Sequence, residues 1–347
     1  MRKRNWDEDD VRVNKSRQFG ASNKARPRTK DRPDYSDAKT AKITEVDRGR
    51  VKCLLVDSSN SINPDGQGQQ AVEITAMKAR ELGKKSVVVG DLVSVVGDLS
   101  GTEGTLARVV TVLPRTNSLT RTIDDRVNDE RVIVANVDQM AIVIAAANPE
   151  PREGFVDRAL VVAFDQGIKP IIIMTKQDLA DGTEFLNTYK DLDITTFKID
   201  KASDLTTLRS TLAGKVTVLL GHSGVGKSTL VNKLLGDEKR ATGDVNDVTG
   251  RGRHTSSSAI ALKLEPKNSS EPPAWIIDTP GVRSFGVAHV EPTRVISAFS
   301  EFTEAINHCP KNCSHNEESC ALNNWPNLTP QNLARLESLR RVISTNS

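Results

Sequence analysis

The chain has 347 residues, a formal net charge of +3 and 27% charged residues. This length suggests two or three domains, and no apolar run reaches the roughly 18–20 residues that span a membrane. The first ten residues lack the apolar core of a secretory signal peptide, so we expect a cytoplasmic protein without a membrane anchor. Nothing in the sequence indicates an obligate oligomer, and we expect a monomer.

The amino-terminal tail, residues 1–39, accounts for the positive charge of the chain. It holds twelve Lys and Arg residues against seven Asp and Glu residues, while the remainder is net negative. Because few of its residues are apolar, we expect the tail to be disordered when free. Its composition allows two interpretations, a solvated tail or an arm that folds on RNA phosphates.

Residues 40–116 are predicted to form a small all-β domain. Residues 41–56 can supply two strands around a turn at Asp47–Gly49, and residues 86–98 a second pair around Gly90 and Asp91. A last strand is expected at 107–115. Short strands with glycine turns indicate a barrel, and a five-stranded OB-type barrel fits the length.

Two features of residues 40–116 limit what this barrel can do. It contains no Tyr, Trp or Phe, so any RNA contact would involve the backbone and shape of the RNA rather than base stacking. Cys53 is alone in a strand run and is expected in the core.

Residues 117–290 are predicted to form the second domain, with residues 117–127 as the linker that leads into it. Strands are expected from about residue 131, and a helix at 155–167 precedes an apolar strand, Pro170–Met174.

Thr175, Lys176, Gln177 and Asp178 follow this strand and fit the base-reading loop of a guanine-nucleotide pocket. Guanine offers two neighbouring N–H donors that one carboxylate can accept, so Asp178 is the predicted specificity residue. Lys176 can pack its stem over the base. The commoner pattern is N-K-x-D, from which Thr175 departs. A second base loop should fall near residues 198–201, which do not match the usual S-A-x pattern.

Residues 221–228 read GHSGVGKS and match the G-x-x-x-x-G-K-[ST] phosphate-loop pattern in full. A strand is predicted before the loop at Val216–Leu220 and a helix after it, which directs backbone N–H groups at a phosphate. Lys227 is expected to reach the β- and γ-phosphates, and Ser228 to bind Mg²⁺. The predicted nucleotide-binding residues of this segment are Gly221, His222, Ser223, Gly224, Val225, Gly226, Lys227, Ser228 and Thr229.

Two further segments fit the γ-phosphate side of the same pocket. Asp278 ends a short apolar strand and opens D-T-P-G, so its carboxylate can hold the Mg²⁺ shell while the Gly281 N–H meets the γ-phosphate. The Gly- and Arg-rich residues 250–258 suit a switch loop that orders on Mg²⁺ and GTP. In that loop Thr255 is preferred over Ser256 as the Mg²⁺ ligand.

The order of these motifs is the most informative feature of the chain. The base-reading loop precedes the phosphate loop, whereas in a conventional GTPase the phosphate loop comes first. The sequence therefore predicts a circularly permuted G domain.

Residues 291–347 are predicted to form a C-terminal domain with helices at about 291–307 and 328–343. Between them, three thiols and an imidazole follow the spacing C-x₃-C-x-H-x₄-C, a complete ligand set for one structural Zn²⁺. The predicted ligands are Cys309, Cys313, His315 and Cys320. His308 is an alternative ligand, and three unrelated buried cysteines are the non-metal interpretation.

With these motifs the chain resembles the RsgA (YjeQ) family of bacterial ribosome-biogenesis GTPases. The likeness also covers VVVGD at Val87–Asp91, LPR and SLTR around 114–121, VDR at Val156–Arg158 and GRHT at Gly252–Thr255. It implies a multidomain α/β and β protein with an N-terminal OB-like barrel, a circularly permuted P-loop GTPase domain and a C-terminal helical zinc-binding segment. It also implies GTP hydrolysis stimulated by the small ribosomal subunit, a role in late maturation of that subunit, and contacts to its rRNA.

The resemblance bears on catalysis as well. Val282 stands where many GTPases carry a Gln that orients the attacking water. The family instead implies that His254 positions the water, with Lys227 and Thr255 completing the catalytic set; a structural or RNA-contacting His254 is the alternative. The family zinc spacing is usually C-x₄-C-x-H-x₅-C, and this chain is one residue shorter in both gaps.

Two other functions remain open from the sequence. An ATP-using P-loop enzyme is disfavoured because the TKQD segment fits guanine. An RNA-binding module with a vestigial G domain is disfavoured because Lys227, Ser228 and Asp278 are all intact.

Overall fold

The computed structural model describes the greater part of the chain, in the segments 35–47, 49–56, 72–82, 87–124, 127–236, 259–266, 271–279, 292–326 and 329–344. Residues Met1–Ser36 and Asp37–Ser347 are two separate units. The predicted disordered tail therefore lies almost entirely outside the described residues. Within the described segments, no helix is long and apolar enough to cross a bilayer.

Five strands close into the predicted barrel. β1 (Lys39–Asp47) pairs with both β2 (Arg50–Leu55) and β4 (Leu92–Gly97). The ring is completed by β3 (Glu73–Lys78), which pairs with β2, and by β5 (Ala107–Val112), which lies parallel to β3 and antiparallel to β4. Alternate residues point inward, and Cys53 is fully buried in this core as expected.

One predicted strand pair of the barrel is wrong. Gly90 and Asp91 precede a single barrel strand, β4, while Val89 forms only an isolated bridge to Val134, outside the barrel. The missing strand is β3, in whose sequence EITAMK only the first four residues alternate between polar and apolar.

The predicted linker at 117–127 is also wrong, because most of it is the first strand of a hairpin. β6 (Ser118–Asp124) pairs antiparallel with β7 (Val127–Ala135). Among the described side chains of this hairpin, Leu119, Val134 and Ala135 are buried. Backbone pairing in a strand rich in Thr and charged residues leaves little hydrophobic pattern for a sequence reading to find.

The G domain is built on a mostly parallel sheet in the order β10-β9-β8-β11-β13-β12. Neighbouring strands from β10 to β13 are parallel and β12 is antiparallel; a single pair, Glu45 with Ile260, joins β12 to β1. The strands are β8 (Gln139–Ala145), β9 (Lys169–Thr175), β10 (Thr195–Lys198), β11 (Val216–Leu220), β12 (Ile260–Leu264) and β13 (Ala274–Asp278). Long apolar runs such as β8 and β11 are typical of parallel strands covered on both faces.

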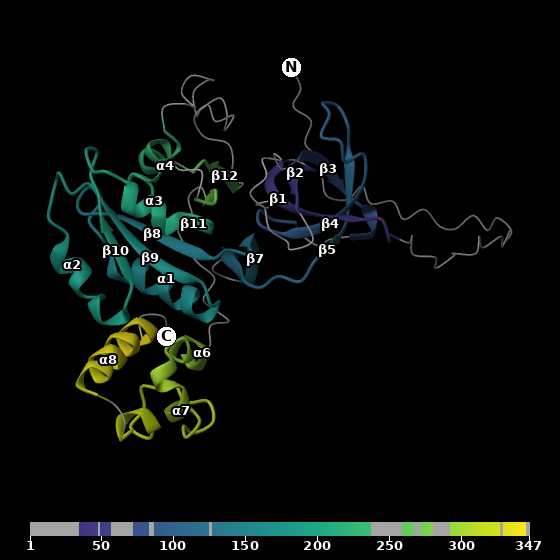
Figure 1. The fold of residues 1–347 in the computed structure, drawn as a ribbon. Helices are drawn as coiled ribbons and strands as arrows, with labels where there is room; N and C mark the ends of the chain where they lie inside the picture. Colours follow the sequence, from purple (N-terminus) through teal and green to yellow (C-terminus); the bar gives the residue numbers. More distant parts are fainter. Residues whose placement is uncertain are drawn as a thin grey trace, which may run out of the picture. The chain divides into compact units, whose positions relative to one another are not determined.

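Helices cover both faces of this sheet (Figure 1). α1 (Glu153–Asp165) packs on the face that carries Ile142 and Ile172. α3 (Thr206–Leu212) and α4 (Lys227–Leu235) pack on the opposite face, with Val143 and Ile171. The remaining short elements of the G domain are α2 (Thr183–Asn187) and the 3₁₀ turn η2 (Lys190–Leu192). A further 3₁₀ turn, η1 (Arg80–Leu82), belongs to the barrel.

The C-terminal segment is helical but more broken than predicted. The helix expected at 291–307 is divided into α6 (Pro292–Ser297), η4 (Ser300–Phe302) and α7 (Thr303–Ile306), because Phe299 takes an extended backbone conformation. η5 (Ala321–Asn323) and α8 (Pro330–Ser344) follow, the latter as predicted.

This segment packs on α1. Phe299 meets Phe164 edge-on at 4.9 Å, and Arg294 pairs with Asp165 at 2.8 Å. A third contact involves α8, where Arg341 donates to both oxygens of the buried Asp157 at 3.1 and 3.0 Å.

Candidate functional site

A cavity of about 640 Å³ lies where the loops after β9 and β10 meet α4. Its walls bring together the predicted base-reading loop, the region expected for the second base loop and the helix that follows the phosphate loop. The lining residues include Thr175, Lys176, Asp178, Ile199, Asp200, Lys201, Gly226, Thr229 and Lys233. The base-reading loop at Thr175 and the start of α4 at Gly226 are far apart in the chain but line one pocket.

Thr175 connects the base-reading loop with the phosphate loop. Its side chain is buried, and its hydroxyl donates to the Val225 carbonyl at 2.5 Å and lies 3.1 Å from the Ile144 carbonyl. A hydroxyl has one proton, so the shorter contact is its principal hydrogen bond. The residue that departs from the N-K-x-D pattern thus holds the two loops together.

The rest of the base-reading loop contacts Asn148 and the start of the second base loop at Ile199. Lys176 has a left-handed backbone, with a φ of 56°, and its ammonium donates to the Asn148 carbonyl. The Gln177 N–H donates to the Ile199 carbonyl at 3.3 Å. Asp178 is exposed at the wall of the cavity.

The loop expected to contact the base a second time is built around Asp200. One oxygen of its carboxylate accepts the Ala202 and Ser203 N–H groups at 2.8 and 2.6 Å and the Ser203 hydroxyl at 2.8 Å. These hydrogen bonds from Ser203 lower the pKa of the Asp200 carboxyl. The loop lines the cavity although its sequence lacks the S-A-x pattern.

The phosphate loop joins β11 to α4 as its sequence predicts. A Cβ on Gly221 would lie 2.3 Å from the Val143 carbonyl oxygen, so glycine is required where the loop leaves the sheet. The Lys227 ammonium donates to the carbonyls of Gly221 and His222, the latter at 3.0 Å. Ser228 lies exposed in the first turn of α4, where helix N–H groups favour an anion.

Charge around Lys227 fits a phosphate site. Burial lowers the pKa of its ammonium, and the nearby Asp278 carboxylate acts in the opposite direction. Asp278 ends β13, and the next residue, Thr279, is buried and donates to the Leu219 carbonyl at 2.8 Å. His254, Thr255 and Gly281 lie outside the described residues.

The C-terminal segment brings together the four predicted metal ligands. The ligand atoms of Cys309, Cys313, His315 and Cys320 all lie within 4.8 Å of one another. The Cys309 and Cys320 sulfurs are 3.9 Å apart, and each lies 3.6–3.9 Å from Nδ1 of His315. Sulfurs at the corners of a tetrahedral zinc site are separated by about 3.8 Å, so the donor set fits a metal ion.

His315 is oriented for this cluster from its other side. Its Nε2 lies 3.0 Å from the Thr293 hydroxyl, a hydrogen bond of the kind that fixes a ligating imidazole. The Arg340 guanidinium donates to the His315 carbonyl at 2.7 Å. The alternative ligand, His308, instead stacks on Trp325 at 5.3 Å.

Comparison with known proteins matches residues 112–288 to the family model of the RsgA GTPase. A protein of Pseudomonas aeruginosa named small ribosomal subunit biogenesis GTPase RsgA is 36% identical over 247 residues, which cover 68% of this chain and 69% of the relative. A protein of the same name from Nitrosospira multiformis is 34% identical and covers 76% and 82% respectively. The chain belongs to the RsgA GTPase family. As a member of this family it is a GTPase, a hydrolase that acts on GTP.

Two solved structures share the fold of this RsgA family member. YjeQ from Thermotoga maritima has a TM-score of 0.56 at 21% identity and covers 88% of this chain and 99% of its own. YloQ, described as a circularly permuted GTPase, has a TM-score of 0.55 at 20% identity and covers 89% and 96%. The predicted permuted fold is therefore confirmed.

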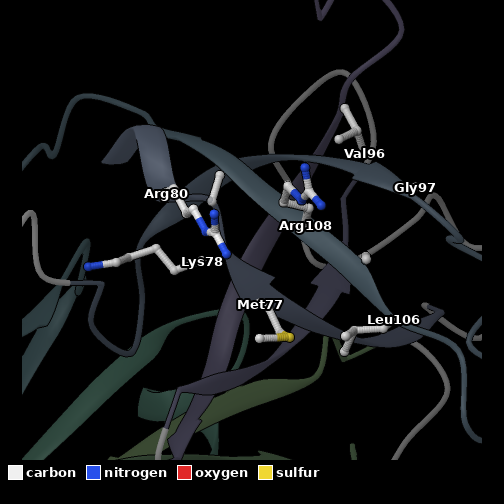
Figure 2. A pocket seen from close by; sticks show the side chains of 9 residues that line it. Met77, Lys78, Arg80, Val96, Gly97, Leu106 and Arg108 are labelled. Atoms are coloured by element: carbon white, nitrogen blue, oxygen red, sulfur yellow. The ribbon is translucent and has the colours of Figure 1, made fainter. Parts of the chain in front are cut away.

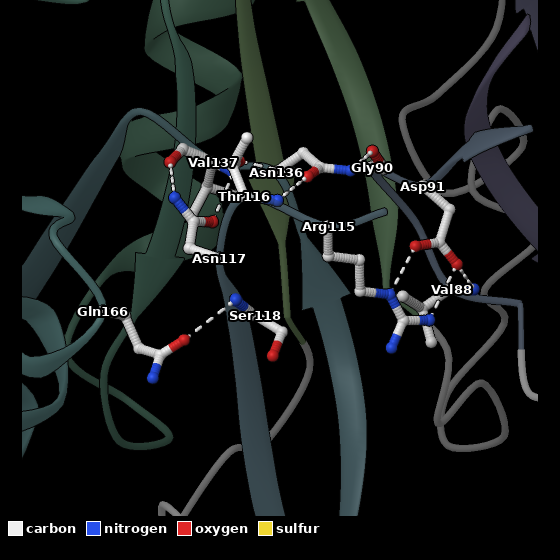
Figure 3. A network of polar contacts seen from close by, with 10 residues as sticks. All are labelled: Val88, Gly90, Asp91, Arg115, Thr116, Asn117, Ser118, Asn136, Val137 and Gln166. Carbon is white, nitrogen blue, oxygen red and sulfur yellow. Dashed lines mark hydrogen bonds and ion pairs between the residues drawn. The ribbon is translucent and has the colours of Figure 1, made fainter. Parts of the chain in front are cut away.

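The family motifs VVVGD and LPR meet in a polar network at the start of the G domain (Figure 3). Arg115 makes a two-pronged ion pair with the fully buried Asp91, at 2.7 and 2.9 Å, and Asp91 also accepts the Val88 N–H at 2.8 Å. Gly90 packs so closely that a Cβ would lie 1.9 Å from the Ala135 carbonyl oxygen.

The same network includes Asn136 and Gln166, the residues that directly follow β7 and α1. The Asn136 side chain donates to the Gly90 carbonyl at 3.0 Å and accepts the Thr116 N–H at 2.9 Å. The Ser118 N–H donates to the Gln166 side chain at 3.1 Å. Sequence reasoning noted these motifs only as a family likeness, and their structural role was missed.

A groove of about 720 Å³ on the barrel was also missed (Figure 2). Three cationic side chains, Lys78, Arg80 and Arg108, line it, and none of its described lining residues carries a carboxylate. Met77 and Leu106, which are 44% and 41% exposed, form its apolar part. The cations come from β3, η1 and β5, and folding brings Arg108 to the same groove as Lys78 and Arg80.

Proposed function

We propose that this chain is a GTPase that assists late maturation of the small ribosomal subunit and hydrolyses GTP faster when bound to it. The observation that carries the proposal is the cavity shared by the TKQD loop and the phosphate-loop helix. The names of the relatives add the partner, since each is called a small ribosomal subunit biogenesis GTPase. We further propose that it acts as a monomer in the cytoplasm, and light scattering checks the oligomeric state.

In this proposal the predicted site residues bind different parts of the nucleotide. Asp178 accepts the guanine N–H donors, and the Lys176 stem packs over the base. Lys227 releases its loop carbonyls to reach the β- and γ-phosphates, while the Gly281 N–H meets the γ-phosphate. Ser228, Thr255 and Asp278 would hold Mg²⁺, whose oxygen ligands they can supply and which neutralises charge between the phosphates.

We assign the orientation of the attacking water to His254, because Val282 has no hydrogen-bonding group. The imidazole can accept a proton from water where an aliphatic side chain cannot. His254→Ala is expected to bind GTP normally and to lose most of its subunit-stimulated turnover. Full stimulated turnover in this variant would assign His254 a structural or RNA-contacting role.

We propose that the metal at the Cys₃His cluster is Zn²⁺ in a closed structural site. Three thiolates and one imidazole leave no ligand position open, and Cys313, His315 and Cys320 are buried while Cys309 is half-buried. When bound, the metal would fix the short loops between α7 and α8 that have little core of their own.

We propose that the barrel groove contacts rRNA, because its cations can neutralise backbone phosphates. Replacing Arg80 and Arg108 by Ala is expected to weaken binding to small subunits and to flatten its salt dependence, with GTP affinity unchanged. The matched control replaces Lys169 and Lys190, which are also exposed cations but lie in the G domain. If both double variants lost the same affinity for small subunits, the groove would not be a specific rRNA contact.

The deciding experiment measures GTP and ATP hydrolysis with and without purified small ribosomal subunits. Slow GTP turnover that subunits accelerate strongly, with no use of ATP, is the expected result. GTP turnover indifferent to subunits would keep the GTPase and discard the ribosomal partner. ATP turnover equal to that of GTP would refute the assignment of Asp178.

A further inference from the structure

Lys233 attaches the second base loop to the helix that follows the phosphate loop. It lies in the last turn of α4, and its ammonium donates to the Lys201 carbonyl at 3.0 Å and to the Ser203 carbonyl. Its side chain lines the same cavity as Ile199, Asp200 and Lys201. One cation thus joins two walls of the pocket.

The contacts within the loop do not fix its position. The hydrogen bonds from Ala202 and Ser203 to the Asp200 carboxylate close a turn inside the loop. At its start, the Ile199 N–H donates to the Met174 carbonyl at 2.8 Å, which extends the pairing of β10 with β9. Residues 201–203 lie beyond that pairing, and Lys233 links this part of the loop to α4.

Base preference depends on how firmly such a loop is held. Hydrogen-bonding groups that read a base discriminate only when the backbone presents them in a fixed position, and a shift of about 1 Å weakens them. A charged donor to two carbonyls makes stronger hydrogen bonds than a neutral one. The loop has no S-A-x sequence to shape it, so its attachment matters more here.

We propose that Lys233 is a positioning residue that sets the preference for guanine by holding residues 199–203 at the cavity. This inference rests on the proposed function, since it takes the cavity as the guanine site. It assigns Lys233 no contact with the reacting phosphates. Its loss should therefore change nucleotide binding and leave the chemical step alone.

The test compares Lys233→Met, Lys233→Arg and the control Lys169→Met, which removes an exposed cation at the amino end of β9. Amide hydrogen exchange of residues 199–204 is measured on the nucleotide-free protein. Dissociation constants for GDP and ADP follow, and then KM and kcat for GTP with small subunits. We expect Lys233→Met to exchange faster in the loop and to bind GDP about tenfold more weakly, which is about 1.4 kcal/mol.

The same variant should raise the KM for GTP with kcat and ADP binding unchanged. Lys233→Arg should restore most GDP affinity because a guanidinium can also donate to both carbonyls.

Unchanged exchange and GDP affinity within twofold of wild type in Lys233→Met would overturn the inference. So would weakened GDP binding without faster exchange, because Lys233 would then contact the nucleotide directly. A wild-type protein without guanine preference would instead overturn the proposed function, and the control separates both from a general charge effect.

Discussion

Replacement of Arg115 by Met tests the buried ion pair where the barrel leads into the G domain. Asp91 is fully buried and receives two charge-assisted hydrogen bonds from Arg115, whose side chain is 24% exposed. Removal of one partner of a buried pair costs roughly 3–5 kcal/mol, because the remaining charge is left without compensation. Since water reaches part of Arg115, we expect the lower end, about 3 kcal/mol.

Hydrogen exchange is the appropriate assay because it reports local opening of one part of a multidomain chain. A loss of about 3 kcal/mol corresponds to a roughly hundredfold faster exchange of amides in residues 88–97, including the Val88 N–H that Asp91 accepts. The matched control is Lys52→Met, which removes the cation of a surface pair with Glu45, at 2.9 Å and 51% and 32% exposed. Exposed pairs contribute about 0–1 kcal/mol, so this control should exchange nearly as wild type.

A double replacement separates charge from packing. Asp91→Asn retains an oxygen that can accept the Val88 N–H and removes the buried charge. Combined with Arg115→Met, it should therefore restore part of the lost protection, which is a non-additive result. The reasoning is refuted if Arg115→Met exchanges like Lys52→Met, or if the two replacements at the pair simply add.

Four further results are expected. Gly221→Ala should abolish nucleotide binding in a filter assay while the melting temperature falls only modestly, because the new Cβ would meet a backbone oxygen at 2.3 Å; normal GDP binding would show that the loop can move aside. Thr175→Val should bind GDP about fivefold to tenfold more weakly, for the loss of one hydrogen bond, and Thr175→Ser should bind as wild type; equal behaviour of the two would assign the effect to shape. Burial raises the pKa of the Cys53 thiol to about 12, so above about pH 9 the unfolded chain loses a proton that the folded one keeps. The free energy of unfolding should fall there by about 1.4 kcal/mol per pH unit more than in Cys53→Ala, and parallel pH profiles would contradict this. Elemental analysis should find one zinc per chain, lost in Cys313→Ser together with protection of the surrounding loops; a folded, metal-free wild type would exclude the site.

The structure brings together predicted motifs where chemistry restricts the choice of residue. A phosphate loop needs glycine at Gly221 and an ammonium at Lys227, and parallel strands around it need long apolar runs. The four predicted metal ligands likewise have few substitutes. Such constraints appear in the sequence as fixed spacings, which is why both the order of the nucleotide motifs and the cysteine cluster could be read directly.

The parts that were missed depend on contacts without a pattern. The β6–β7 hairpin is built on backbone pairing, and Asp91 reaches Arg115 across 24 residues. Lys233 binds carbonyl groups, which every residue carries, so no partner residue could be searched for in the sequence. The division of the helix at Phe299 escaped for a related reason, because its apolar residues keep helical spacing on both sides of the break.

Circular permutation leaves the nucleotide pocket intact because the pocket depends on strand order in the sheet and not on order in the chain. β11 lies between β8 and β13, with β9 next to β8, so the loops after β9 and β11 open at the same edge of the sheet. Permutation changes which elements carry the flanking domains. The chain enters the G domain through β7 directly before β8, and it leaves after β13, whose last residue Asp278 lies beside Lys227 at the phosphate loop. α1 lies between these regions: its Phe155 stacks on His222 of the phosphate loop at 4.4 Å, and its Asp157 holds Arg341 of the C-terminal helix. A single helix therefore contacts both the phosphate loop and the C-terminal helical segment. If the G domain ended at β10, with its base-reading loops last as in the conventional motif order, this segment would follow β10 and not β13, whose end lies at the phosphate loop.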